Sequence, residues 1–200
     1  MKKGLTELVI ILDQSGSMHG LESDVVGGFN SLVESQIKSG GETLITTIMF
    51  SDTSDLVHNR TNAKSIKKLT ENDYEPHGCT ALLDAVGNAV CSLEKTHRNI
   101  KEDELPENII FSIMTDGLEN ASIEYSKDMV KKLIESQRKI GWEFMFQAAN
   151  IDAFDEGYKL GMDSKDISTF KADKVGVSLC MCQISKGIIE KRKNHKKNID

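Results

Sequence analysis

The sequence lacks most of the features that mark membrane or disulfide-stabilised proteins. Its 200 residues include four cysteines, two prolines and one tryptophan. No run approaches the ~18 apolar residues of a membrane-spanning helix. The cysteines are too few and too irregularly spaced for a disulfide framework. We therefore expect Cys79, Cys180 and Cys182 to be buried free thiols, and a reducing, cytoplasmic location. The N-terminal apolar run is short and interrupted by Glu7, so we expect no signal peptide.

Charge is distributed unevenly along the chain. The formal net charge is −6, yet residues 186–200 are basic, with Glu190 and Asp200 as their only acids. The remaining acidic body argues against nucleic-acid binding, which depends on basic surface. The basic end has two interpretations, a contact with an acidic partner or cations placed favourably at a helix C-terminus. We favour the second, because the helix macrodipole attracts positive charge there.

Apolar runs alternate with amphipathic helical segments along the whole chain. The predicted strands cover residues 5–12, 43–50, 55–60, 108–114, 142–149 and 167–170. The predicted helices cover residues 21–38, 80–93, 126–140, 153–160 and 174–195, with a short helical turn at 63–69. The loop at 51–54 is too short for a crossover helix, so the second and third strands should be antiparallel. Gly27-Gly28 would be explained by a close approach of the first helix to the sheet.

This alternation predicts the fold class and the domain organisation. Continuous apolar strands between helices indicate a doubly wound, mostly parallel α/β sheet with helices on both faces. No repeat or linker divides the chain, so we predict one domain over residues 1–200. In such sheets, ligands bind at the carboxyl ends of the strands, near the point where strand order reverses.

Oxygen-bearing side chains alternate directly after the first predicted strand. Asp13, Ser15 and Ser17 follow the apolar run of residues 8–12. A loop that leaves a strand can direct every second side chain at one point. Carboxylate and hydroxyl oxygens suit a hard divalent cation, so this segment indicates a site for Mg²⁺ or Mn²⁺.

Two further segments supply oxygen donors to the same edge of the sheet. Asp116 follows the fourth predicted strand, and Thr80 precedes a predicted helix. Taken alone, Asp116-Gly117 is an ordinary turn signal and Thr80 an ordinary helix N-cap. Taken together, the three segments predict a metal site formed by Asp13, Ser15, Ser17, Thr80 and Asp116.

These segments resemble the von Willebrand factor type A (VWA) domain, the Rossmann-like fold shared with integrin I domains. The matching residues are Asp13-x-Ser15-x-Ser17, Gly78-Cys79-Thr80-Ala81-Leu82 and Thr115-Asp116-Gly117. In that family they form the metal-ion-dependent adhesion site (MIDAS). The resemblance implies a six-stranded sheet in the order 3-2-1-4-5-6 with an antiparallel third strand. It also implies that Ser15 and Ser17 bind the metal directly, whereas Asp13, Thr80 and Asp116 bind directly or through water.

The resemblance favours a non-enzymatic, Mg²⁺-dependent protein-binding module. A partner's Asp or Glu carboxylate would complete the metal shell, with neither nucleic acid nor membrane involved. Similar intracellular bacterial proteins act as scaffolding parts of larger complexes. Two alternatives stay open: a metal-assisted hydrolase with His19 or His77 as general base, and a metal that serves stability alone.

One segment at the same edge is open to two interpretations. Asn150 and Asp152 follow the fifth predicted strand and would line the rim of the site. For Asp152 we favour a different role, as the N-cap of the next helix.

Overall fold

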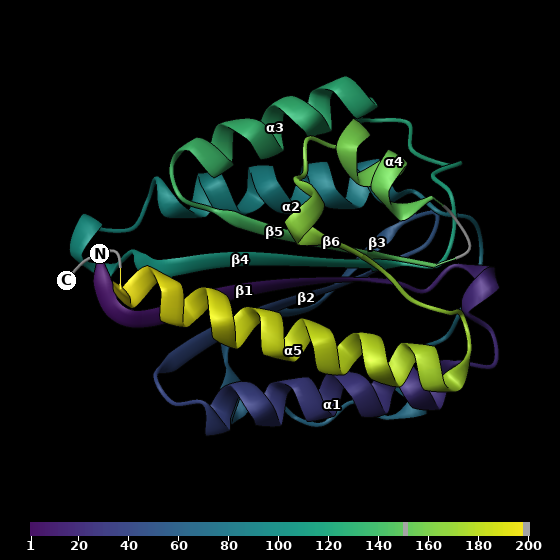
Figure 1. Ribbon diagram of the computed structural model, residues 1–200, viewed down its shortest axis with the longest axis horizontal. Helices are drawn as coiled ribbons and strands as arrows, with labels where there is room; N and C mark the ends of the chain where they lie inside the picture. The colour runs from purple at the N-terminus through teal and green to yellow at the C-terminus, as the bar shows by residue number, and fades with distance from the viewer. Residues whose placement is uncertain (150–151, 198–200) are drawn as a thin grey trace.

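A six-stranded sheet runs through the middle of the molecule, in the order β3-β2-β1-β4-β5-β6 (Figure 1). The computed structural model describes residues 1–149 and 152–197. The strands are β1 (Lys2–Asp13), β2 (Glu42–Phe50), β3 (Ser54–Asn62), β4 (Pro106–Thr115), β5 (Glu143–Ala148) and β6 (Ile167–Thr169). β3 pairs antiparallel with β2, and the other pairs are parallel. Both the strand order and the antiparallel third strand are confirmed.

Helices cover both faces of this sheet (Figure 1). α1 (Glu22–Lys38) and α5 (Lys174–Lys197) lie side by side on one face. α2 (Leu82–His97), α3 (Lys127–Lys139) and α4 (Ala153–Lys159) cover the other. Short 3₁₀ turns occupy Gly16–Met18, Ala63–Ser65, Glu71–Asp73, Glu102–Glu104 and Ser164–Asp166.

The central strand β1 explains why the first apolar run is continuous. Leu8, Ile10 and Leu12 belong to the core beneath α1 and α5, whereas Val9 and Ile11 belong to the core beneath α2 and α3. All five side chains are almost fully buried. Successive side chains of a strand point to opposite faces, so a strand covered on both faces needs apolar residues at every position.

Some predicted boundaries are wrong by a few residues. α2 begins at Leu82 and continues to His97, past the predicted end at residue 93. Its last turn adds Glu94, Lys95 and Thr96, which carry no apolar periodicity but continue the backbone hydrogen bonds. The helical turn predicted for residues 63–69 covers only Ala63–Ser65, because the backbone is extended at Ile66.

One glycine of the pair in α1, Gly28, faces a helix and not the sheet, which corrects the prediction. A methyl group added to Gly28 would lie 2.5 Å from Met181 Cγ of α5, whereas one added to Gly27 would meet nothing within 4 Å. Gly28 therefore allows α1 and α5 to pack closely.

Two of the basic residues near the C-terminus form contacts inside the molecule. Lys191 Nζ lies 2.7 Å from Glu143 Oε2 and 2.8 Å from Asp166 Oδ1. The Arg192 guanidinium donates to Ser39 Oγ at 2.8 Å and also to the Gly40 carbonyl, at the C-terminal end of α1. A cation at a helix C-terminus interacts favourably with the unpaired carbonyls there. Arg192 therefore lies at the C-terminal end of α1, whereas the prediction placed the basic residues at the end of their own helix.

The predicted burial of the thiols holds for one of the three. Cys180 is buried in the core between α5 and the sheet. Cys182 is exposed, because positions two apart on a helix face in nearly opposite directions. Cys79 is also exposed, in the loop before α2.

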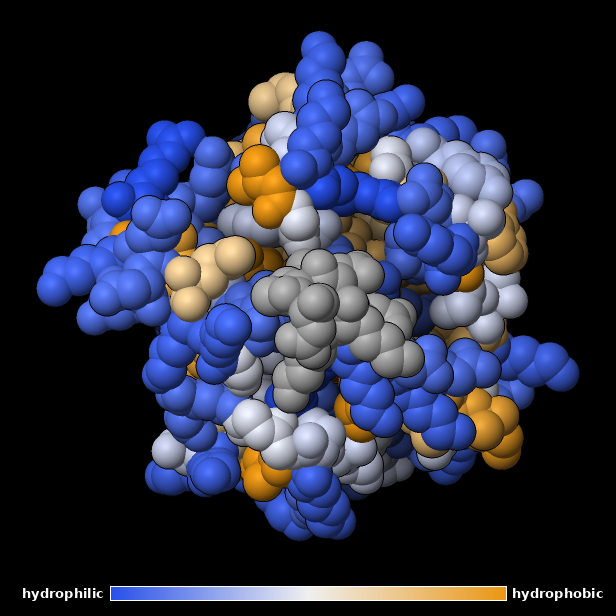
Figure 2. Space-filling view, turned by 60° about the vertical axis from the view of Figure 1, so that its left-hand side comes forward, coloured by the Kyte–Doolittle hydropathy of each residue, from blue (hydrophilic) through white to orange (hydrophobic). Residues whose placement is uncertain are grey.

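The surface on the side of the chain ends is mostly hydrophilic, and its apolar residues form small separate patches (Figure 2). Among the helices described, none is long and apolar enough to cross a membrane.

Candidate metal site

Three loops meet at the carboxyl edge of the sheet, where the sequence predicts the metal site. Backbone hydrogen bonds join the loop after β1 to the loop before α2, from His77 N to Gln14 O at 2.8 Å and from Gly16 N to Gly78 O at 3.1 Å. The third loop follows β4, whose last residues pair in parallel with β1. Parallel pairing places the ends of β1 and β4 side by side, and with them Asp13 and Asp116.

Asp13 is buried and held at both carboxylate oxygens. Its Oδ1 accepts a hydrogen bond from Ser15 N at 2.7 Å, and its Oδ2 accepts one from Thr115 Oγ1 at 2.5 Å. The Tyr74 hydroxyl donates to the Asp13 backbone carbonyl. The carboxylate therefore has a fixed orientation, set by β4 and by the loop that it begins.

The two serines of the first loop connect Asp13 to Asp116. Ser15 Oγ and Ser17 Oγ lie 3.1 Å apart, and Ser17 Oγ donates to Asp116 Oδ1 at 2.6 Å. Asp116 is 2% exposed, and its Oδ2 has no hydrogen-bond partner among the described residues. Ser15 is buried and Ser17 is exposed, so the cluster opens to solvent at Ser17.

Thr80 brings the fifth predicted donor to the same place. A methyl group on Gly117 would lie 3.3 Å from Thr80 Oγ1 and 3.7 Å from Ser17 Oγ, which places both hydroxyls beside the backbone that follows Asp116. The N-cap position of α2 belongs to Ala81, so the side chain of Thr80 is not the helix cap. The structure thus gathers all five predicted residues at one edge of the sheet.

Burial, and no basic side chain, dominates the pKa of both carboxylates in the cluster. Burial raises the pKa of Asp13, against the opposing effect of the hydrogen bonds from Thr115 and Ser15. Burial also raises the pKa of Asp116, against the hydrogen bond from Ser17. No positively charged side chain of the described residues contributes to either pKa shift. Burying a carboxylate without a counter-charge is unfavourable, and a bound cation would remove that penalty.

Asn120 fixes the position of Thr80 and was not predicted from the sequence. Its Oδ1 accepts from Thr80 N at 2.9 Å, and its backbone N donates to Thr80 O at 3.0 Å. Tyr74 was missed as well, since a single tyrosine between polar residues carries no pattern. Thr115 belongs to the Thr115-Asp116-Gly117 segment, but no role is predicted for it from the sequence. Its position at the end of a buried strand is the sequence feature that indicates a contact with the site.

Two acidic residues hold the loop after Asp116 against the start of α2. Asp84 accepts backbone hydrogen bonds from Ile123, Glu124 and Tyr125 at 2.8–3.0 Å. Glu119 accepts from Leu83 N at 2.9 Å and from Ser122 N at 2.8 Å. These carboxylates are occupied by backbone donors, so they serve the loop's conformation.

The two histidines near the cluster both lie close to polar groups. His77 Nε2 lies 3.0 Å from Ser51 Oγ, and its Nδ1 lies 2.7 Å from the Glu75 carbonyl oxygen. His19 Nδ1 lies 3.5 Å from Glu22 Oε1, and its side chain is 68% exposed.

At the rim, Asp152 is the N-cap of α4, as favoured, and accepts from Asp155 N at 3.0 Å. Asn150 lies outside the described residues.

The donor set fits a hard cation better than a soft one. It consists of two carboxylates and three hydroxyls, with the unpartnered Asp116 Oδ2 among them. In the parts of the chain described, no three His, Cys, Asp or Glu side chains gather into a metal-binding group. A site here would therefore depend on hydroxyl oxygens, which suit Mg²⁺ or Mn²⁺.

Comparisons with solved structures identify the fold. A TM-score of 0.68 relates the chain to proximal thread matrix protein 1 from the mussel byssus, solved with a zinc-occupied MIDAS motif, at 17% identity over 93% of this chain. The manganese-loaded TRAP protein of Plasmodium vivax gives a TM-score of 0.59, at 15% identity over 90% of this chain and 72% of that one. The SpRpn10 VWA domain gives a TM-score of 0.62, at 12% identity over 90% of this chain and 95% of that one.

These likenesses show that the chain has the fold of a VWA domain. The chain spans about half of the mussel protein, 46% of its length. No protein-family model matches the sequence, and no curated protein matches it either.

Proposed function

We propose that this protein is a divalent-metal-dependent protein-binding module of the MIDAS type. Asp13, Ser15, Ser17, Thr80 and Asp116 would hold the ion, which we expect to be Mg²⁺ or Mn²⁺. When bound, the metal would supply a positive centre that attracts an Asp or Glu carboxylate of a partner protein. Two of the structures with the same fold are described as zinc-occupied and manganese-loaded, which supports a divalent ion.

One observation supports this proposal above the others. Asp116 Oδ2 is buried without a hydrogen-bond partner among the described residues, beside a chain of hydroxyls that ends at the exposed Ser17. An unpaired buried carboxylate oxygen is unfavourable and needs a reason. A cation shared with the hydroxyls would satisfy it.

Each side chain of the cluster has its own role in this proposal. Asp13 and Asp116 supply negative charge, and Ser15, Ser17 and Thr80 supply neutral oxygen. Thr115 orients Asp13 by donating to its Oδ2. Two carboxylates at most balance the charge of a divalent ion, so a third carboxylate from a partner is still attracted.

Both ring nitrogens of His77 already have polar partners. Nδ1 lies 2.7 Å from Glu75 O, and Nε2 lies 3.0 Å from Ser51 Oγ. His77 would have to leave one of these partners before it could act as the base for a water on the metal. None of the three compared structures is named for a catalytic activity.

Metal titration of paired variants tests the site. Isothermal titration with Mn²⁺ should show one binding site in the wild type. Asp116→Asn keeps the side-chain size but removes a charge, and should weaken Mn²⁺ binding at least tenfold. Asp128→Asn, which changes an exposed carboxylate of α3, is the matched control and should leave binding unchanged.

Partner recognition needs a second measurement. A peptide library containing Asp or Glu should be retained on the immobilised protein with Mg²⁺ and released by EDTA. The same library with Asn or Gln at those positions should not be retained. Retention of both libraries, or retention that survives EDTA, would exclude a metal-bound partner carboxylate.

A further inference from the structure

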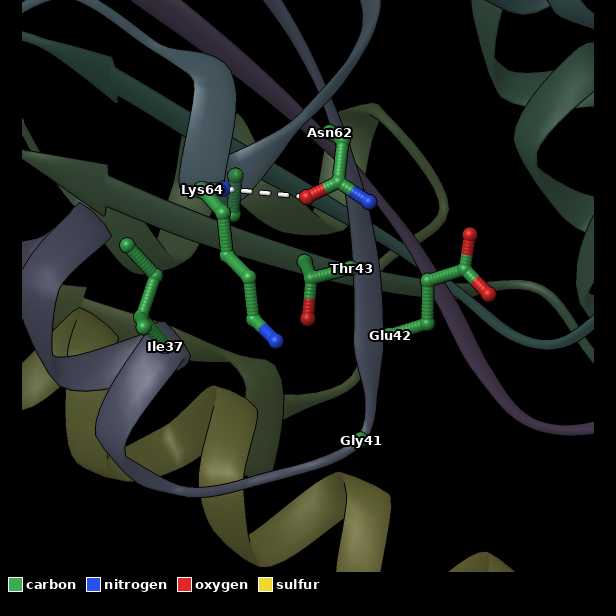
Figure 3. A pocket seen from close by; sticks show the side chains of 7 residues that line it. Ile37, Gly41, Glu42, Thr43, Asn62 and Lys64 are labelled. Carbon is green, nitrogen blue, oxygen red and sulfur yellow. Dashed lines mark hydrogen bonds between the residues drawn. The ribbon is translucent and has the colours of Figure 1, made fainter.

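A pocket lies near the ends of four elements, separate from the loops of the metal site. It has a volume of about 440 Å³ and is lined by residues that include Ile37 of α1, Thr43 of β2, Asn62 of β3 and Lys64 of the Ala63–Ser65 turn. Figure 3 shows these side chains around one space. The pocket lies where β2 begins and β3 ends, whereas the metal site lies where β1 and β4 end. Its volume falls in the range that holds small molecules.

A buried hydroxyl in this pocket has no partner. Thr43 is 3% exposed, and its Oγ1 forms no hydrogen bond with any described residue. In Figure 3 this oxygen points toward the same space as the Lys64 ammonium group. Most buried side-chain oxygens in proteins have a partner, so an unpartnered hydroxyl that lines a pocket indicates a missing polar group.

Lys64 supplies a cation beside this hydroxyl. Within the described part of the chain, the Lys64 ammonium group has no ion-pair partner, whereas its backbone N donates to Asn62 Oδ1 at 3.0 Å. That hydrogen bond fixes the amide of Asn62, whose Nδ2 is turned away from the Lys64 ammonium group in Figure 3. The shared space therefore offers a cation and a hydroxyl.

Lys64 is the basic residue that lines this pocket. Residues 60–68 include four basic residues and no acid, but Arg60 and Lys68 are paired with Glu7 and Glu34. Glu42, also at the pocket, is already paired with Lys2 Nζ at 2.6 Å. One unpaired cation beside an acidic group suits a single negative charge better than a double one.

We propose that this pocket binds a small organic monocarboxylate. The carboxylate would accept hydrogen bonds from Lys64 Nζ and Thr43 Oγ1. The short apolar part of the ligand would lie against Ile37 and Ala63, which line the same pocket. This site is independent of the metal site and of its proposed function.

Titration with butyrate, followed by amide chemical shifts in ¹H–¹⁵N spectra, tests the pocket. The solution contains EDTA, so that a carboxylate bound to a metal cannot contribute. The amides of Gly41, Thr43 and Lys64 should shift and saturate with butyrate. Lys64→Gln removes the cation and should weaken binding about tenfold, and Thr43→Val should weaken it several-fold.

A neighbouring lysine provides the matched control. Lys67 belongs to the same basic segment but does not line the pocket, so Lys67→Gln should leave butyrate affinity unchanged. Melting temperatures within a degree or so of wild type would confirm that the variants fold. Shifts that never saturate, equal losses in the two lysine variants, or tighter binding of inorganic phosphate would each overturn the proposal.

Discussion

At the scale of single residues, Glu7 is a charged group buried in the middle of the sheet. Its side chain is completely buried on β1. Arg60 Nε lies 2.8 Å from Glu7 Oε1, close enough for an ion pair although without hydrogen-bond geometry. His97 Nε2 lies 2.7 Å from the other oxygen, and its ring packs edge-on against Trp142. The three polar side chains connect β1, β3 and α2.

Replacing Glu7 by glutamine should destabilise the protein markedly. The change leaves Arg60, with a side chain 20% exposed, without its counter-charge. Breaking a buried ion pair by removing one partner costs on the order of 3 kcal/mol. Urea denaturation measures the loss. Glu94→Gln, which breaks an exposed pair with Arg98, should change the free energy of unfolding by less than about 1 kcal/mol. Equal effects of the two changes would contradict a role for the buried cluster.

The thiols should differ sharply in their reactivity. Burial raises the pKa of Cys180 to about 12, so below that pH its thiolate is scarce and inaccessible. Cys182 and Cys79 are exposed and should react with a maleimide at pH 8, Cys79 more slowly because the Asp52 charge raises its pKa. Peptide mass spectrometry after timed labelling distinguishes the sites. Labelling of Cys180 in the native protein at the rate of Cys182 would show that α5 opens readily.

At the scale of elements, the packing of α1 against α5 depends on one glycine of a pair. Gly28 lies against Met181, and Gly27 faces open space. Arg192 adds a polar contact at the other end of the helix pair, where α1 ends. The close approach and the polar contact together fix the position of the C-terminal helix.

Alanine substitutions at the two glycines should have opposite effects. Gly27→Ala should raise the free energy of unfolding by up to about 1 kcal/mol, because alanine favours the helix and meets no neighbour. Gly28→Ala places a methyl group 2.5 Å from Met181 Cγ and should lower it by about 1–3 kcal/mol. Chemical denaturation of both variants measures the difference. Similar stabilisation by both changes would mean that α5 moves aside without penalty.

At the scale of the whole molecule, metal binding should be linked to stability. A ligand that binds only the folded state at a hundred times its Kd stabilises by about 2.7 kcal/mol. For a chain of this size that corresponds to a rise in Tm of about 5–10 °C. Thermal unfolding in Mg²⁺ and in EDTA measures the rise, which Asp13→Ala should abolish. A Tm that is the same in both solutions would contradict a metal bound between these loops.

The sequence by itself determined the layered α/β fold, because the spacing of apolar residues indicates which faces of each strand and helix are buried. It also determined that Asp13, Ser15 and Ser17 lie together, because they alternate within one short loop. The sequence also predicted Thr80 and Asp116 at the same edge of the sheet. Only the tertiary structure decided which distant side chains hold these elements in place. Packing brings distant partners into contact with Tyr74, Asn120 and Met181, and these partners are far away in the chain. The same holds for Thr43 and Lys64, whose shared pocket exists only where separate elements meet.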